Sequence, residues 1–125
     1  MRFIPTALHG VVDYAVGMLL TALPLYLGWL GMPRVALVSL GIFVIVYSAF
    51  TDYELGVIRF LRVRFHLLLD ALVGAALLAI TATADLPQPY SALLVAIGVI
   101  AFVLVATTKV RAIGSHSEAS LRQRS

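Results

Sequence analysis

The chain has 125 residues, of which 62% are hydrophobic and 12% are charged. A water-soluble fold this short could not bury so much apolar side chain, because small domains bury a small share of their surface. The absence of cysteine excludes disulfides, thiolate metal sites and cysteine nucleophiles, and no motif indicates an enzyme or a catalytic residue. The formal net charge of +3 comes from basic residues near the ends of apolar segments, which is typical of membrane proteins rather than of nucleic-acid binding.

Four apolar stretches are long enough, or nearly so, to cross a bilayer, which takes about 20 residues. The first is expected over about Ala7 to Trp29 and the second over about Pro33 to Phe50. The third is expected over about Phe65 to Ala84 and the fourth over about Tyr90 to Thr108. The composition and these stretches together predict an all-α membrane protein with four transmembrane helices.

Short turns rich in Gly and Pro, at 28–33 and 85–90, join the first helix to the second and the third to the fourth. Turns this short permit only antiparallel helical hairpins. Of the nine basic residues, only Arg34 lies on the side of these turns. The excess of Lys and Arg on the other side predicts that both termini and the central loop are cytoplasmic.

The connection between the second and third helices has a pattern of its own. Thr51, Asp52 and Glu54 form part of a capping box, with Glu54 three residues after Thr51. The residues that follow alternate apolar side chains with Arg59 and Arg62. This pattern predicts a short amphipathic helix at the membrane interface, with its arginines toward lipid phosphate. The alternative is an extension of the second helix that emerges into water. The polar tail, 111–125, is expected to be disordered and cytoplasmic, which leaves 1–110 as the transmembrane domain.

An internal repeat relates the two halves at a constant offset of 57 residues. Segments of about 2–51 and 59–108 share 14 identities without a gap. The informative pairs are His9/His66, Asp13/Asp70, Gly17/Gly74, Gly41/Gly98 and Thr51/Thr108. Because the offset spans two helices, the sequence predicts parallel repeats related by a pseudo-two-fold axis along the membrane normal.

His9, Asp13 and Gly17 are spaced at i, i+4 and i+8, as are their counterparts His66, Asp70 and Gly74, so each set lies on one stripe of a helix. A carboxylate facing lipid is costly. We therefore expect the two stripes to face each other and to bring His9, Asp13, His66 and Asp70 together near the cytoplasmic leaflet. Glycines on these stripes, and Gly41 and Gly98 on the partner helices, are expected to allow close helix packing.

Three interpretations of this polar cluster remain open. In the first, the cluster is structural, and His–Asp hydrogen bonds hold the two halves in register. In the second, two imidazoles and two carboxylates bind a divalent metal such as zinc, manganese or iron. In the third, the groups relay protons or escort a small solute in a transporter or proton-coupled subunit, which with only four helices favours a homo-oligomer. Haem ligation by the two histidines is a further, less favoured alternative.

The segments Phe3-Ile4-Pro5-Thr6, His9-Gly10-Val11-Val12-Asp13-Tyr14 and Thr51-Asp52-Tyr53-Glu54-Leu55-Gly56 resemble bacterial SPW-repeat membrane proteins, as does His66-Leu67-Leu68-Leu69-Asp70 with Gly74. The namesake Pro-Trp element is degenerate, since Leu25 follows Pro24 in the first repeat and Thr81 replaces the proline in the second. The resemblance implies a multi-pass protein of the bacterial inner membrane, with the lipid bilayer as its partner. It implies no activity.

Overall fold

A computed structural model describes residues 2–52 and 55–109. These residues contain four helices and no strands: α1 (Thr6–Tyr26), α2 (Met32–Ala49), α3 (Val63–Thr83) and α4 (Tyr90–Thr107). Each helix is long and apolar enough to cross a membrane. At a rise of 1.5 Å per residue they are about 27–32 Å long, which matches a hydrocarbon core of about 30 Å. The sequence prediction of four such helices is confirmed.

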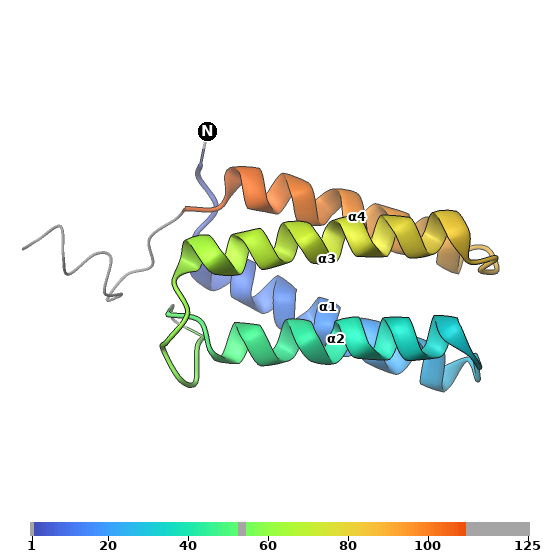
Figure 1. The fold of residues 1–125 in the computed structure, drawn as a ribbon. Helices are drawn as coiled ribbons and strands as arrows, with labels where there is room; N and C mark the ends of the chain where they lie inside the picture. The colour runs from blue at the N-terminus through green and yellow to red at the C-terminus, as the bar shows by residue number, and fades with distance from the viewer. Residues whose placement is uncertain (1, 53–54, 110–125) are drawn as a thin grey trace, which may run out of the picture.

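The helices form two antiparallel hairpins, α1 with α2 and α3 with α4, lying side by side (Figure 1). The first turn contains Gly28 and Gly31, whose φ values of 70° and 73° favour glycine. Pro33 lies in the first turn of α2, where a backbone N–H would have no partner within the helix. Because proline has no N–H, it is well suited to this position. Local turn chemistry therefore stops α1 and starts α2 within a few residues.

Glycines lie where the helices of each hairpin pack together. A Cβ added to Gly41 would lie 2.6 Å from the Gly17 carbonyl oxygen, and one added to Gly74 would lie 3.2 Å from the Gly98 carbonyl oxygen. Farther toward the turns, the core consists mainly of four buried leucines that pack together: Leu20, Leu37, Leu77 and Leu94. The 57-residue offset also relates Leu20 to Leu77 and Leu37 to Leu94.

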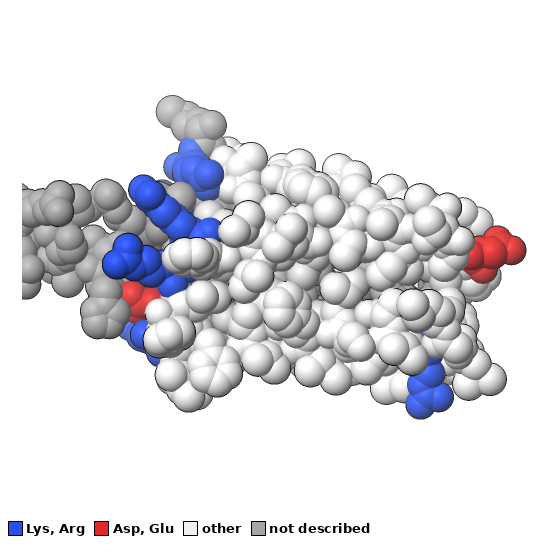
Figure 2. All heavy atoms as spheres, viewed as in Figure 1, with Lys and Arg blue, Asp and Glu red and all other residues white. Residues whose placement is uncertain are grey.

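Charge is concentrated at one end of the bundle, and its middle is apolar on the face drawn in Figure 2. The N-terminal segment, the α2–α3 connection and the end of α4 lie at the charged end, and the two hairpin turns lie at the other (Figure 1). Arg34 and Asp85 are the charged residues near the turns. On this face, the charged side chains of the described residues therefore lie at the two ends and not over the apolar middle that would contact hydrocarbon.

The predicted interfacial helix is wrong for the residues described, because 55–62 are not helical. The backbone N–H groups of Val57 and Ile58 donate to the Ala49 carbonyl, and those of Phe60 and Leu61 donate to the Phe50 carbonyl. The segment thus folds back on the C-terminal end of α2 and satisfies carbonyls that the helix leaves free. Glu54 and the tail from 110 lie outside the described residues.

Candidate functional site

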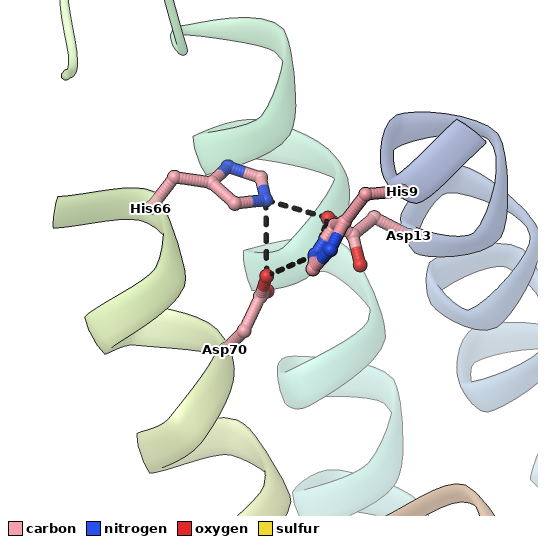
Figure 3. A group of neighbouring side chains, drawn as sticks. All are labelled: His9, Asp13, His66 and Asp70. Atoms are coloured by element: carbon pink, nitrogen blue, oxygen red, sulfur yellow. Dashed lines mark hydrogen bonds and ion pairs between the residues drawn. The ribbon is translucent and has the colours of Figure 1, made fainter. Parts of the chain in front are cut away.

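Helices α1 and α3 supply the four residues of the His/Asp cluster: His9, Asp13, His66 and Asp70. Each aspartate lies seven residues beyond the start of its helix, about 10 Å along the axis. All four side chains point toward one another (Figure 3) and are buried, with exposed fractions of 2% to 7%. The structure therefore brings together the four residues that the repeat singled out.

The imidazole and carboxylate atoms alternate around a ring. His9 Nε2 lies 2.6 Å from Asp70 Oδ2 and 3.1 Å from Asp13 Oδ2. His66 Nε2 lies 2.5 Å from Asp13 Oδ2 and 3.1 Å from Asp70 Oδ2. The two shorter contacts cross between α1 and α3, so each hairpin supplies the partner of the other hairpin's histidine.

Threonines hold the far side of both imidazoles. His9 Nδ1 lies 2.6 Å from Thr108 Oγ1, and His66 Nδ1 lies 2.7 Å from Thr51 Oγ1. Thr51 Oγ1 also donates its single proton to the Tyr47 carbonyl at 2.6 Å. The Thr51 oxygen must therefore accept a hydrogen bond from Nδ1–H of His66.

This assignment constrains the centre of the cluster. With Nδ1 of His66 protonated, its Nε2 faces two carboxylate oxygens, and a bare nitrogen lone pair there would be repelled by both. A positive charge must lie between these atoms, either as protons or as a metal ion. Two protons on the ring nitrogens, or one divalent ion, would each balance the two carboxylates.

The four atoms fit a small metal ion. His9, Asp13, His66 and Asp70 each offer one ligand atom, and all four atoms lie within 4.8 Å of one another. Bonds of about 2.0–2.2 Å to one ion place neighbouring ligands about 2.8 Å apart at right angles and up to about 3.5 Å apart in a tetrahedron. The two sides of 3.1 Å lie within this range. The two sides of 2.5 and 2.6 Å are shorter, so these atoms would have to move apart by a few tenths of an ångström to bind one ion.

Tyr47 of α2 completes the surroundings of the cluster, because its hydroxyl donates to Asp70 Oδ1. Tyr47 carries no repeat signal in the sequence, because the 57-residue offset pairs it with Leu104. Thr108 could have been found from its pairing with Thr51. Asp52 is buried and its N–H donates to the Leu61 carbonyl, so its backbone joins the ends of the hairpins.

The fold and the cluster together define an all-helical, multi-pass type of membrane protein with a buried His₂Asp₂ centre between two helical hairpins. Comparisons of the chain with family models, with curated proteins and with solved structures found no match.

Proposed function

We propose that the protein is a small, multi-pass protein of the bacterial inner membrane that binds one divalent metal ion between its two hairpins. The ligands are Nε2 of His9 and His66 and one carboxylate oxygen each of Asp13 and Asp70. The observation that carries the proposal is the convergence of these four atoms within 4.8 Å in a buried site. Two imidazoles and two carboxylates without thiolate suit zinc, manganese or ferrous iron.

The contacts around the cluster support this proposal. Metal-bound histidines commonly donate their second ring N–H to an oxygen, which fixes the ring orientation. Thr51 Oγ1 provides this partner for His66. Thr108 Oγ1 lies 2.6 Å from Nδ1 of His9, in the corresponding position. The Tyr47 hydroxyl in turn donates to Asp70 Oδ1, the carboxylate oxygen that does not face the histidines.

We further propose that the two hairpins are parallel repeats with both termini and the α2–α3 connection in the cytoplasm. Several backbone hydrogen bonds support the repeat, because they recur at an offset of 57. Ile4 N–H donates to the Thr107 carbonyl and Leu61 N–H to the Phe50 carbonyl, and the N–H groups of Lys109 and Asp52 donate back to the Ile4 and Leu61 carbonyls. The basic residues at that end support the orientation.

A purely structural cluster is the second candidate. It is favoured because every ring nitrogen of the two histidines already has an oxygen partner at 2.5–2.7 Å. In that case protons alone would balance the carboxylates, and the cluster would only hold the hairpins in register.

Elemental analysis of the full chain purified in detergent separates the two candidates. We expect about one equivalent of metal per chain in the natural sequence, and loss of that metal in His9→Ala and His66→Ala. The third histidine, His116, belongs to neither of the two His-Asp-Gly sets of the repeat. His116→Ala is therefore the matched control and should keep the metal.

A natural-sequence protein that stays metal-free after incubation with Zn²⁺, Mn²⁺ and Fe²⁺ would overturn the metal site. A lower melting temperature in His9→Ala, without any metal in the parent, would then establish the structural role. Because the parent's own metal content decides, the test stands even where a variant does not fold.

A further inference from the structure

The two hairpins differ at one contact of the His/Asp cluster. Asp70 Oδ1 accepts a hydrogen bond from the Tyr47 hydroxyl. The residue 57 positions after Tyr47 is Leu104, which cannot donate. Among the described residues, none donates a hydrogen bond to Asp13 Oδ1, although Asp13 is only 7% exposed. One carboxylate oxygen of the cluster thus lacks the phenol that its counterpart has.

Asp13 lines a cavity of about 150 Å³. All four helices line it: apart from the cluster and Tyr47 the lining is apolar, with Val12 and Val16 from α1, Val44 from α2, Val73 and Leu77 from α3, and Ile97, Ala101 and Leu104 from α4. At an offset of 57, the α4 residues correspond to Leu40, Val44 and Tyr47 of α2.

α4 carries smaller side chains than α2 at the corresponding positions that line the cavity. Ala101 and Leu104 stand where α2 has Val44 and Tyr47, and Ile100 stands where α2 has Phe43. The Phe43 and Tyr47 rings pack edge to face with centroids 5.0 Å apart, and α2 packs against α3, whereas α1 and α4 pack less closely. α4 therefore fills less of the space inside the bundle than α2 does, which leaves room beside Asp13.

We propose that this cavity binds a small phenol, whose hydroxyl donates to Asp13 Oδ1 and whose ring contacts the apolar wall. The chemistry is that of the protein's own Tyr47, which meets Asp70 in the same way. An apolar cavity of about 150 Å³ is large enough for a benzene ring. Such a site combines an apolar wall with a single well-placed acceptor, as small-molecule sites commonly do.

The ligand reaches the cavity from the lipid side. Ile100, which lines it, is 51% exposed on the outer surface of the bundle. A phenol dissolved in the hydrocarbon region therefore meets the site without crossing the charged end.

Phenol binding does not depend on the proposed metal. Asp13 faces both histidines through Oδ2, so Oδ1 is available whether protons or a metal ion occupy the centre. The test is accordingly made on chelator-treated full-length protein and repeated after metal addition, so that failure of one proposal leaves the other measurable.

Saturation-transfer NMR of phenol and toluene in detergent micelles tests the proposal. Phenol should bind at least about tenfold more tightly than toluene, because it adds a hydrogen bond to a charged acceptor. Leu104→Tyr should remove phenol binding by supplying the missing hydroxyl from within the chain. Val103→Tyr is the matched control, since Val103 is 54% exposed and does not line the cavity, and it should bind phenol as the natural sequence does.

Equal binding of phenol and toluene would overturn the proposal, as would undiminished phenol binding in a folded Leu104→Tyr variant. Folding is checked by circular dichroism, where Leu104→Tyr should melt no lower than the natural sequence because it fills a cavity. If that variant does not fold, Ala101→Leu fills the same space from α4, and phenol binding retained in it contradicts the proposal equally.

Discussion

At the scale of single residues, the threonine hydroxyls decide how firmly the imidazoles are held. Each threonine oxygen lies within 2.7 Å of an Nδ1 atom, on the side of the ring away from the carboxylates. A partner in this position fixes the ring so that Nε2 points to the centre. Thr51 and Thr108 therefore orient the two imidazoles, although their own hydroxyls lie on the side of the rings away from the centre of the cluster.

Thr108→Val tests this orienting role, because valine keeps the shape of threonine and removes the hydroxyl. We expect metal affinity to fall by about 10- to 100-fold, as is typical when the outer partner of a metal-bound histidine is lost. Competition with a chromophoric chelator measures the affinity. Thr107→Val is the neighbouring control, since its hydroxyl donates to the Val103 carbonyl and not to the cluster. An equal loss in both variants would contradict the role of Thr108.

Tyr47→Phe should lower stability, because the buried Asp70 oxygen loses its hydroxyl donor. Hydrogen bonds to charged groups contribute about 1.5–3 kcal/mol, and we expect the free energy of unfolding to fall by about that amount. Denaturant titration in micelles, followed by circular dichroism, gives the value. Tyr26→Phe, at an 89% exposed position, should change stability by no more than about 0.5 kcal/mol. Equal stability of the two variants would argue against the Tyr47–Asp70 contact.

At the scale of the helices, composition and turn chemistry were enough to find the fold. The observed bounds of α1, Thr6–Tyr26, and of α4, Tyr90–Thr107, lie within a few residues of the predicted stretches. A membrane helix satisfies its own backbone, so its extent depends mostly on local hydrophobicity and on Gly and Pro at its ends. The His/Asp cluster followed from the spacing of polar residues on two equivalent helices.

The segment between α2 and α3 shows what such patterns miss. The alternation of apolar and basic residues from Leu55 to Arg62 suits an amphipathic helix, but the N–H groups of Val57 and Leu61 bind carbonyls at the end of α2 instead. Thr51, predicted as a helix cap, bonds to His66. These partners lie on other elements, and no local pattern records them. Tyr47 likewise meets Asp70 on another helix, and its counterpart in the repeat, Leu104, gives no indication of that contact.

The glycine contacts predict an asymmetry between the hairpins. A Cβ on Gly41 would lie 2.6 Å from the Gly17 carbonyl oxygen, which belongs to the backbone, whereas a Cβ on Gly98 would first meet Leu78 Cδ2 at 2.9 Å. A leucine side chain can move more easily than a helix backbone. We expect Gly41→Ala to destabilise the protein by about 1–3 kcal/mol and Gly98→Ala by less, as measured by denaturant titration in micelles. The reverse order would show that helix separation is not set by these contacts.

At the scale of the whole molecule, the cluster, the chain ends and the basic residues share one end of the bundle. The hydrogen bonds from Ile4 to Thr107 and from Leu61 to Phe50 tie the start of one hairpin to the end of the other. The His9–Asp70 and His66–Asp13 contacts also join one hairpin to the other, farther into the bundle. These hydrogen bonds between the hairpins therefore lie at the charged end, and the orientation in the membrane would decide which compartment supplies the proposed metal ion.

The absence of cysteine gives a direct test of that orientation, because a single introduced thiol reports without background. Val57→Cys lies in the α2–α3 connection, where Val57 is 80% exposed, and Gln88→Cys lies in the exposed turn before α4. With the basic end in the cytoplasm, a membrane-impermeant maleimide should label Gln88→Cys in intact bacterial cells and Val57→Cys only after the membrane is opened. The opposite pattern would place the cluster near the outer leaflet, so that its metal would come from outside the cytoplasm, with the four helices unchanged.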